Sequence, residues 1–201
     1  MDDMDNVKQT ILVTSLKLFS EKGYEGVSVS ELAAAAGITK PTLYYYFGNK
    51  EGVFEAVCGV NYALLDAAIA KSAVYTPNPE SYYEDIFKTL INVSKAYFEF
   101  AVKNEFFYRL VMANLSMPRS GAVFDVVQKY HFKQYDSITK MFRAMAESHS
   151  NLKGKDKQLT WSFIGAINSY VSLTFNGISK GELDEMTIRE FVRQFMHGIY
   201  V

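Results

Sequence analysis

The chain has 201 residues, of which 49% are hydrophobic and 21% are charged, and its formal net charge at pH 7 is −1. This length fits one domain or a small domain joined to a larger one, and the composition excludes a disordered or collagen-like chain. The single cysteine, Cys58, excludes an internal disulfide and a multi-cysteine metal site, and the near-zero net charge gives no electrostatic indication of nucleic-acid binding.

The N-terminal residues 1–6 include three aspartates and lack the basic segment and apolar run of a secretion signal, so we expect a cytoplasmic protein. The uncharged stretch 158–179 is long enough to span a bilayer, but hydroxyl and amide side chains recur along it and are unfavourable in lipid. We therefore expect this stretch to be buried in a helical bundle, and we expect no membrane partner.

Apolar residues recur at spacings of three and four, and no stretch alternates apolar and polar residues, so the pattern predicts an all-α fold. The first helix ends at Gly23, a residue type that commonly stops helices. Ser28 and Glu31 form a capping box at the start of a second helix, which continues through four alanines. Thr39 caps a third helix, in which Pro41 occupies the first turn.

Gly48 and Asn49 interrupt the chain after the third helix, and a longer helix over about 50–71 follows. The sequence thus predicts about nine helices, arranged as a three-helix, homeodomain-like head over 1–48 and a larger helical body over 49–201, with 49–72 as the connecting helix. The helices expected in the body after the connecting helix cover about 79–103, 105–115, 122–148, 155–179 and 184–199.

The second and third predicted helices are joined by a three-residue turn and have the dimensions of a helix-turn-helix, in which the second helix enters the DNA major groove. If Leu43 and Phe47 face the core, the three consecutive tyrosines 44, 45 and 46 lie on the outer side or the edges of the helix. Their hydroxyls can bond phosphate oxygens and their rings can contact a sugar or a thymine methyl. A tyrosine-rich core and a protein interface are the alternatives.

Residues 28–51, SVSELAAAAGITKPTLYYYFGNKE, resemble the DNA-binding signature of the tetracycline-repressor (TetR) family. The preceding residues 18–24, LFSEKGY, match the pattern at the end of its first helix. The similarity is specific over about residues 10–57, and beyond them only the number and spacing of helices agree. The resemblance implies a homodimeric, ligand-responsive transcription factor, usually a repressor, whose body over 49–201 binds an effector and forms the dimer.

At the positions that match the family signature, the resemblance implies that the first residues of the third helix face base edges. It also implies that serine, tyrosine and lysine side chains contact the phosphate backbone. Because no arginine precedes Arg109, the head has no arginine to read guanine, and Lys40 is the expected guanine contact. We therefore expect modest base discrimination at each site. The expected DNA-binding residues are Ser28, Lys40, Pro41, Thr42, Tyr44, Tyr45, Tyr46 and Lys50.

One short recognition helix reads too few base pairs for useful affinity, so we expect two heads on successive major grooves, about 34 Å apart, of a pseudo-palindromic DNA operator. The last two predicted helices are the expected interface of the homodimer, because 155–179 is apolar on two faces and 184–199 has a broad apolar stripe. A purely intramolecular core is the alternative.

Residues 51–201 contain 13 Phe, 10 Tyr and the lone Trp161. Pockets in helix bundles are apolar with a few inward polar groups, so we expect a small hydrophobic or aromatic effector, oriented by His131 and Asn168. A hydrogen-bonded core histidine and an interface asparagine are the alternative roles for these two residues. The residues expected to line the pocket are Tyr97, Phe98, Phe107, Met112, His131, Tyr135, Phe142, Trp161 and Asn168.

Gly52 and Gly59 each weaken the connecting helix by roughly 1 kcal/mol relative to alanine, and we expect this helix to act as a lever that moves the recognition helices when the effector binds. The sequence has no metal-ligand spacing around its histidines and no catalytic or phosphate-binding motif, so we predict neither a metal, nor a cofactor, nor an enzyme. The alternatives to a ligand-responsive repressor are a helical protein-binding adaptor and a small-molecule binding protein without DNA binding.

Overall fold

The computed structural model of the chain describes residues 3–115, 117–178 and 183–198. Over these residues the chain forms ten α-helices and one short 3-10 helix, without strands, which confirms the predicted all-α fold. The chain divides into two compact units. The first unit comprises residues 1–63 and 104–131, and the second unit comprises residues 64–103 and 132–201.

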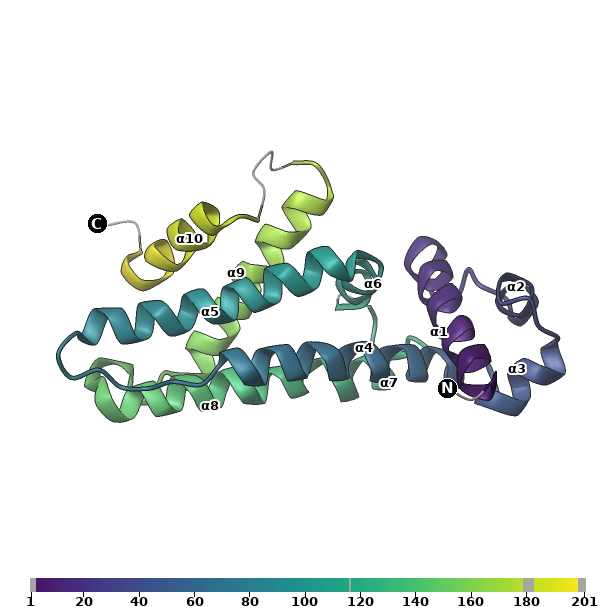
Figure 1. Cartoon of the computed structure of the whole chain (residues 1–201), viewed down its shortest axis with the longest axis horizontal. Helices are drawn as coiled ribbons and strands as arrows, with labels where there is room; N and C mark the ends of the chain where they lie inside the picture. The colour runs from purple at the N-terminus through teal and green to yellow at the C-terminus, as the bar shows by residue number, and fades with distance from the viewer. Residues whose placement is uncertain (1–2, 116, 179–182, 199–201) are drawn as a thin grey trace. The chain divides into compact units, whose positions relative to one another are not determined.

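The first unit contains, within its described residues, five complete helices and the N-terminal part of α4 (Figure 1). In this unit α1 packs against both α2 and α6, and its side chains Ile11 and Phe19 are fully buried. The helices are α1 (Asp3–Lys22), α2 (Val29–Ala35), α3 (Lys40–Phe47), residues 50–63 of α4 (Lys50–Ser72), α6 (Glu105–Leu115) and α7 (Phe124–His131).

The predicted helix caps are present in the first unit. The hydroxyl of Ser28 accepts the Glu31 N–H at 3.2 Å, and the Glu31 carboxylate accepts the Ser28 N–H at 2.9 Å, which completes the capping box of α2. The Thr39 hydroxyl accepts the Thr42 N–H at 3.3 Å at the start of α3. Gly23 follows α1 with a φ of +70°, a conformation that favours glycine.

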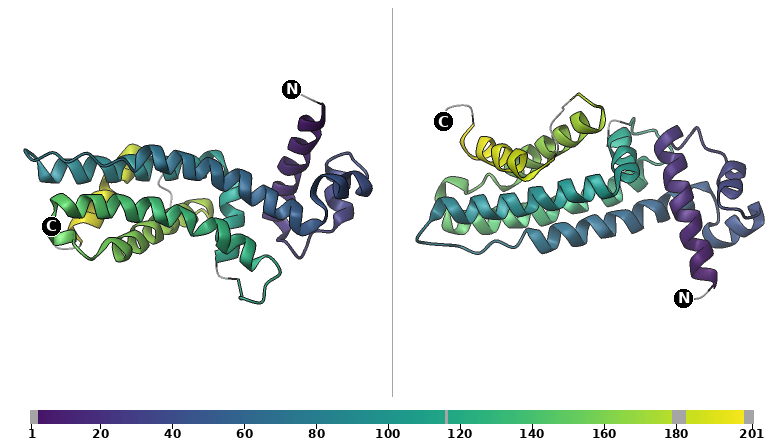
Figure 2. Two further views of the ribbon diagram at one scale, coloured as in Figure 1. Left: turned by 90° about the horizontal axis from the view of Figure 1, so that it is seen from below. Right: turned by 45° about the horizontal axis from the view of Figure 1, so that its top comes forward.

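The second unit contains the remaining helices and an aromatic interior. Its helix α8 packs against α9, and α5 packs against α10 (Figure 2). The rings of Phe142 and Phe191 both contact Phe163, with centroids 5.9 and 5.7 Å away. The elements are residues 64–72 of α4, α5 (Tyr82–Lys103), α8 (Lys133–Ser148), the 3-10 helix η1 (Ser150–Leu152), α9 (Asp156–Phe175) and α10 (Glu185–His197).

The long helix predicted over 122–148 is divided in the structure. α7 ends at His131, and α8 begins at Lys133. Between them the Tyr135 N–H bonds the Phe132 carbonyl oxygen at 3.1 Å, a tighter step than in an α-helix. The sequence gives no sign of this break because neither proline nor glycine marks it.

The end of α9 also differs from the prediction. The helix stops at Phe175, because Gly177 has a φ of +67° and the N–H groups of Gly177 and Ile178 bond back to the carbonyls of Thr174 and Leu173. These bonds form a Schellman motif. Residues 179 and 199, where the last two helices were predicted to end, and Gly181, where the chain was predicted to turn, lie outside the described residues.

The stretch 158–179, weighed above as a membrane span, contains buried core residues of α9, among them Phe163 and Ile167. By length and apolar composition, α4 is the one described helix that could cross a bilayer. Core helices of soluble proteins satisfy the same criterion, and α4 buries Val53, Phe54 and Ile69 completely.

Candidate nucleic-acid interface

The helix-turn-helix is formed by α2, a turn at residues 36–39 and α3. Leu32 on α2 and Leu43 on α3 are completely buried, and the two helices pack against one another. Phe47, which was also expected to face the core, is half-buried, and so is Ala36. The apolar faces of α2 and α3 are therefore packed inside the first unit. Because the Leu43 side of α3 is packed, the opposite side of α3 faces outward.

The outer side of α3 presents tyrosine rings. Tyr44 is 46% exposed and Tyr45 is 74% exposed, whereas Tyr46 is half-buried. The ring of Tyr45 meets the ring of Tyr46 edge-on, with centroids 5.3 Å apart. Lys40 and Pro41 are exposed in the first turn of the same helix. α3 thus carries an exposed surface of aromatic rings and hydroxyls beside one cation.

Two of the expected DNA-binding hydroxyls already have partners within the first unit. Ser28 is exposed, and its hydroxyl caps α2. The Thr42 hydroxyl lies 2.8 Å from the Thr39 hydroxyl, in a hydrogen bond in which either atom can be the donor. A hydroxyl has both a donor and acceptors, so these bonds leave it able to make a further contact.

Lys50 lies in the first turn of α4, and its side chain turns toward the loop between α1 and α2. Its Nζ donates to the carbonyl oxygens of Tyr24 at 2.9 Å and Val27 at 3.0 Å. The same ammonium lies over the Tyr24 ring, 4.0 Å from the ring centroid. The structure thus gives an internal role to a lysine for which the resemblance implied a phosphate contact.

Other lysines near the helix-turn-helix are paired with carboxylates. Lys22 lies 2.9 Å from Glu31, and the hydrogen bond from Lys22 is the largest of the effects that lower the pKa of Glu31 to about 2. Lys17 lies 4.0 Å from Glu21. Lys40 is the one lysine within α2, α3 and the turn between them. It is exposed, and no ion pair joins it to another described residue.

Residues 11–57 match the family model of bacterial regulatory proteins of the tetR family. The chain is also similar to IcaR of Staphylococcus aureus, the HTH-type negative transcriptional regulator of the biofilm operon icaADBC. The two are 23% identical over 141 residues, which cover 68% of this chain and 69% of IcaR.

Over its N-terminal part the chain is thus similar to regulators of the tetR family. The chain is a DNA-binding transcriptional regulator with a helix-turn-helix in this part.

Two solved structures share the fold along nearly the whole chain. FadR of Bacillus subtilis in complex with stearoyl-CoA gives a TM-score of 0.77 at 16% identity and covers 96% of this chain and 99% of FadR. AibR in complex with isovaleryl coenzyme A and operator DNA gives a TM-score of 0.68 at 18% identity and covers 94% of this chain and 96% of AibR. At these identities the likeness shows the fold alone.

Three of the residues expected to bind the effector lie in the first unit. Phe107 and His131 are buried and Met112 is half-buried. His131 Nδ1 and the Tyr62 hydroxyl are hydrogen-bonded at 3.0 Å. Burial lowers the pKa of His131 to about 4, so its imidazole is neutral at pH 7.

A small apolar cavity in the first unit lies between α4, α6 and α7. Phe107 is the one expected effector-binding residue among those that line it, and none of the others was predicted to bind an effector. The spacing of four between positions 54, 58 and 62 marks one face of α4, but core residues have the same spacing. The lining residues are Phe54, Cys58, Tyr62, Phe107, Leu110, Val111, Asn114 and Val127.

The other six expected effector-binding residues belong to the second unit. Tyr97 is completely buried, and its hydroxyl donates to Gln134 Oε1 at 3.0 Å. Phe98 and Phe142 are buried, Tyr135 and Asn168 are half-buried, and burial raises the pKa of Tyr135. Trp161 is 62% exposed, so its ring faces away from the interior of the second unit, where the sequence analysis had expected it.

A buried polar cluster in the second unit was not anticipated from the sequence. The Asp85 carboxylate accepts the Tyr75 hydroxyl at 2.7 Å and the Asn78 N–H at 3.0 Å, and it lies 3.1 Å from His149 Nε2. Burial alone would raise the pKa of Asp85, but the hydrogen bonds from Asn78, Tyr75 and His149 outweigh it and lower the pKa. No local motif joins residues so far apart in the chain.

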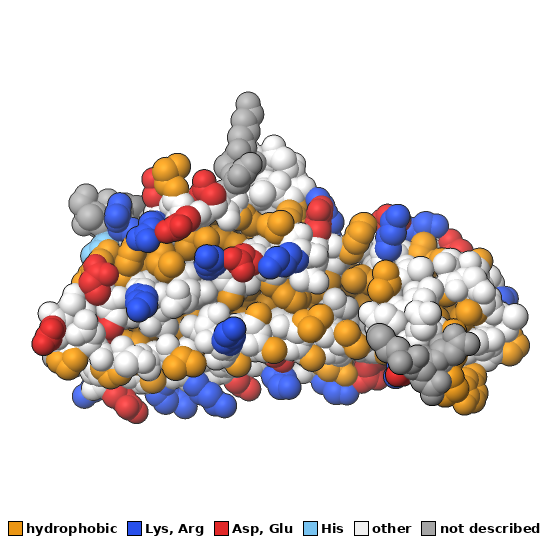
Figure 3. Space-filling model, viewed as in Figure 1, with side chains coloured by type: hydrophobic (Ala, Val, Ile, Leu, Met, Phe, Trp, Pro, Cys, Tyr) orange, Lys and Arg blue, Asp and Glu red, His pale blue; other side chains and the backbone are white. Residues whose placement is uncertain are grey.

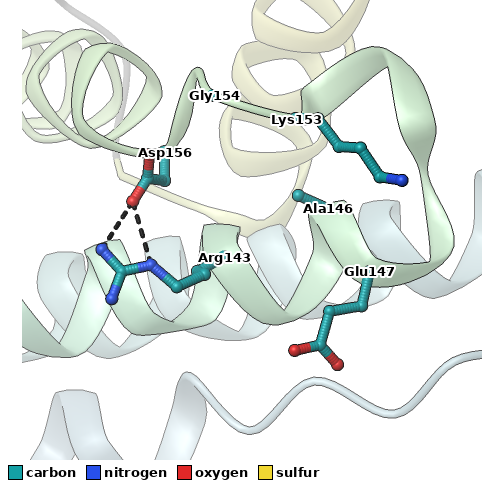
Figure 4. Close-up of a pocket in the computed structure, with 6 residues that line it drawn as sticks. All are labelled: Arg143, Ala146, Glu147, Lys153, Gly154 and Asp156. Atoms are coloured by element: carbon teal, nitrogen blue, oxygen red, sulfur yellow. Dashed lines mark hydrogen bonds and ion pairs between the residues drawn. The ribbon is translucent and has the colours of Figure 1, made fainter.

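Two hollows lie on the surface of the second unit. One, of about 480 Å³, lies beside α8 and the start of α9, where Arg143 Nη2 and Asp156 are 2.8 Å apart (Figure 4). The other, of about 320 Å³, lies between α5 and α10, and on the face drawn in Figure 3 cations and anions alternate over this region. None of the nine expected effector-binding residues lines either hollow.

Proposed function

We propose that this protein is a homodimeric, cytoplasmic repressor that binds a pseudo-palindromic operator and is released from it by a small hydrophobic or aromatic effector. The observation that carries this proposal is the exposed surface of α3, with Tyr45 74% exposed on a helix whose opposite side is packed through Leu43. Exposed aromatic side chains are unfavourable in water, and a DNA duplex offers sugars, methyl groups and phosphates to cover them.

We assign the two parts of the chain different tasks. Residues 1–48 read the operator, with Lys40, Pro41 and Thr42 at base edges and with Ser28 and the tyrosines 44, 45 and 46 along the backbone. Residues 49–201 bind the effector and form the dimer, and the connecting helix 49–72 transmits the change between them. No catalytic step is part of this proposal.

The exposed side of α9 supports a dimer interface. Its residues Trp161, Gly165, Ser169 and Leu173 follow one another at a spacing of four, and all four are exposed. Trp161 is 62% exposed and Leu173 is 42% exposed, whereas Phe163 on the other side is completely buried. A helix with apolar side chains on two sides requires a partner on each, and a second copy of α9 and α10 would supply the missing one.

An acyl thioester fits the proposed hydrophobic kind of effector. The FadR and AibR structures, which have the same fold, hold acyl-CoA molecules. The buried aromatic residues of the second unit would offer an acyl chain apolar contacts, and Tyr97 and Gln134 would offer it a hydroxyl and an amide that are bonded to one another.

A footprint of the purified protein on the DNA that flanks its own gene tests the proposed function. We expect protection of a two-fold symmetric sequence, with half-sites about one helical turn apart. Fatty acids, acyl-CoA thioesters and aromatic acids, added one at a time, should then include a compound that abolishes the protection. Absence of any protected DNA would contradict the proposed operator binding. Protection that none of these compounds changes would contradict the proposed release by an effector.

A further inference from the structure

The loop between α1 and α2 is held from two sides. From the side of α1, Lys22 pairs with Glu31 at 2.9 Å, and Glu31 also caps α2 through the Ser28 N–H. From the side of α4, Lys50 donates to the carbonyl oxygens of Tyr24 and Val27. The start of α2 is therefore connected to two other helices of the first unit.

The turn that Lys50 closes is itself an ordered structure. The Val27 N–H bonds the Tyr24 carbonyl oxygen at 3.3 Å, so this one oxygen accepts both a backbone N–H and the Lys50 ammonium. The Val27 side chain is 1% exposed, and it anchors the turn in the core immediately before the cap of α2. Tyr24 is packed against Phe19 and Phe54, and its ring lies beneath the ammonium.

The contacts of Lys50 occupy most of its N–H donors. An ammonium has three N–H donors, and two of them bond carbonyl oxygens here. The Lys50 side chain is also half-buried, whereas Lys40 on α3 is exposed and has no ion pair with another described residue. To reach a phosphate, Lys50 would have to give up two charge-assisted hydrogen bonds and the Tyr24 ring.

We infer that Lys50 is a positioning residue, which fixes the first turn of α4 to the loop before α2 and so holds the helix-turn-helix in its DNA-binding arrangement. This inference rests on the proposed DNA-binding function. α4 begins three residues after α3 ends, so the same turn of α4 is connected to α3 through the chain and to α2 through Lys50. A movement of α4 is therefore transmitted to both helices of the reading head.

The salt dependence of DNA binding distinguishes a positioning residue from a phosphate contact. Each neutralised phosphate contributes about −0.9 to the slope of log K against log salt, so removing one phosphate-contacting lysine from both subunits lowers the magnitude of the slope by about 2. The loss of a positioning residue weakens binding by the same factor at every salt concentration and leaves the slope unchanged.

The experiment compares Lys50→Met with the matched control Lys40→Met on a duplex that contains the footprinted operator and on an unrelated duplex of equal length. We expect Lys50→Met to weaken binding roughly ten- to hundredfold on the operator with an unchanged salt slope. We expect Lys40→Met, which removes the proposed base-edge contact, to weaken binding to the operator more than binding to the unrelated duplex. A slope whose magnitude falls by about 2 in Lys50→Met would overturn the inference.

A second measurement uses the unmodified protein and does not depend on the variant folding. The rate of lysine acetylation, followed by mass spectrometry, is compared between Lys50 and Lys40 with and without the operator duplex. We expect Lys50 to react slowly in both samples and Lys40 to react rapidly until DNA protects it. Equal rates in the free protein, or protection of Lys50 by DNA alone, would overturn the inference.

These results also separate the inference from the proposed function. If no duplex binds at any salt concentration, the proposed function fails. In that case slow acetylation of Lys50 in the free protein still supports the internal contacts of Lys50. Faster hydrogen exchange at residues 24–28 in Lys50→Met than in the unmodified protein would show that Lys50 fixes the loop. Unchanged exchange at these residues would show that it does not.

Discussion

The helix-turn-helix and the second unit use their aromatic side chains in opposite ways. On α3, Tyr44 and Tyr45 are exposed, and the helix ends are set by short-range caps and glycines. In the second unit, Phe142 and Phe163 are buried and join α8 to α9. The head thus has an exposed aromatic surface that a partner can cover, whereas the aromatic side chains of the second unit stabilise its interior.

The largest effect on stability is expected from removing a ring from that interior. Phe163 is completely buried among the rings of Phe142, Phe191 and Phe195, so Phe163→Ala should lower the free energy of unfolding by about 3–5 kcal/mol. Denaturant unfolding measures this change. The neighbouring Ser162→Ala, at an exposed position of the same helix, should leave the stability nearly unchanged. Similar losses in both variants would show that burial does not decide stability in this unit.

The buried polar cluster of the second unit should give the next largest effect. Asp85→Asn leaves the donors of Tyr75, Asn78 and His149 without a carboxylate and should cost about 2–4 kcal/mol at pH 7. The exposed Asp136→Asn is the matched control on α8.

The same substitution should change the dependence of stability on pH. The pKa of Asp85 is lower in the folded chain than its ordinary value of 3.8, so the unfolded chain binds more protons as the solution is acidified. The stabilisation by Asp85 is thus complete above pH of about 5 and decreases as the pH falls through 3.8 and below. Urea unfolding between pH 3 and 7 should show a steeper acid decline in the unmodified protein than in Asp85→Asn, and parallel curves would refute this.

A change on the exposed side of α3 should affect DNA binding while leaving the fold intact. Tyr45→Ala removes a side chain that is 74% exposed, so its effect on the free energy of unfolding should stay within about 0.5 kcal/mol. Its affinity for the operator should fall by roughly tenfold, because both the ring and the hydroxyl contacts are lost. Fluorescence anisotropy with a labelled duplex measures the loss, and unchanged affinity would argue against this surface as the reading face.

The smallest effect is expected at the cap of α2. Ser28→Ala removes the acceptor of the Glu31 N–H and should lower the free energy of unfolding by about 1 kcal/mol. Ser30→Ala, inside the same helix and also exposed, is the control that keeps the cap. Thermal melting compares the stabilities of Ser28→Ala and Ser30→Ala. Equal melting temperatures would mean that the cap does not define the start of the helix.

The sequence predicted the parts of the fold that depend on neighbouring residues. Ser28 and Thr39 cap their helices three residues away from their partners, and both caps are present as predicted. The burial of Leu43 and the exposure of Tyr45 follow from the period of a single short helix. For the same reason, the helix-turn-helix and its resemblance to the TetR signature were visible without coordinates.

The sequence did not predict features that depend on residues distant in the chain. Lys50 bonds carbonyl oxygens more than 20 positions away, and backbone carbonyls leave no trace in a residue pattern. Asp85 and His149 come together only after the second unit has folded. Trp161 was expected to line a pocket, but the spacing of apolar residues along a helix with two apolar sides does not say which side faces the interior.

The buried thiol of Cys58 would make the movement proposed for the two heads of a dimer measurable. Burial raises the pKa of Cys58 to about 12, so almost no thiolate exists at neutral pH and maleimide or methanethiosulfonate reagents would leave the native residue intact. A second cysteine introduced at an exposed position of the head, such as Glu25, would then take a spin label selectively. Distances between two such labels across a dimer would report head separation with and without a candidate inducer, and the natural cysteine would not have to be removed first.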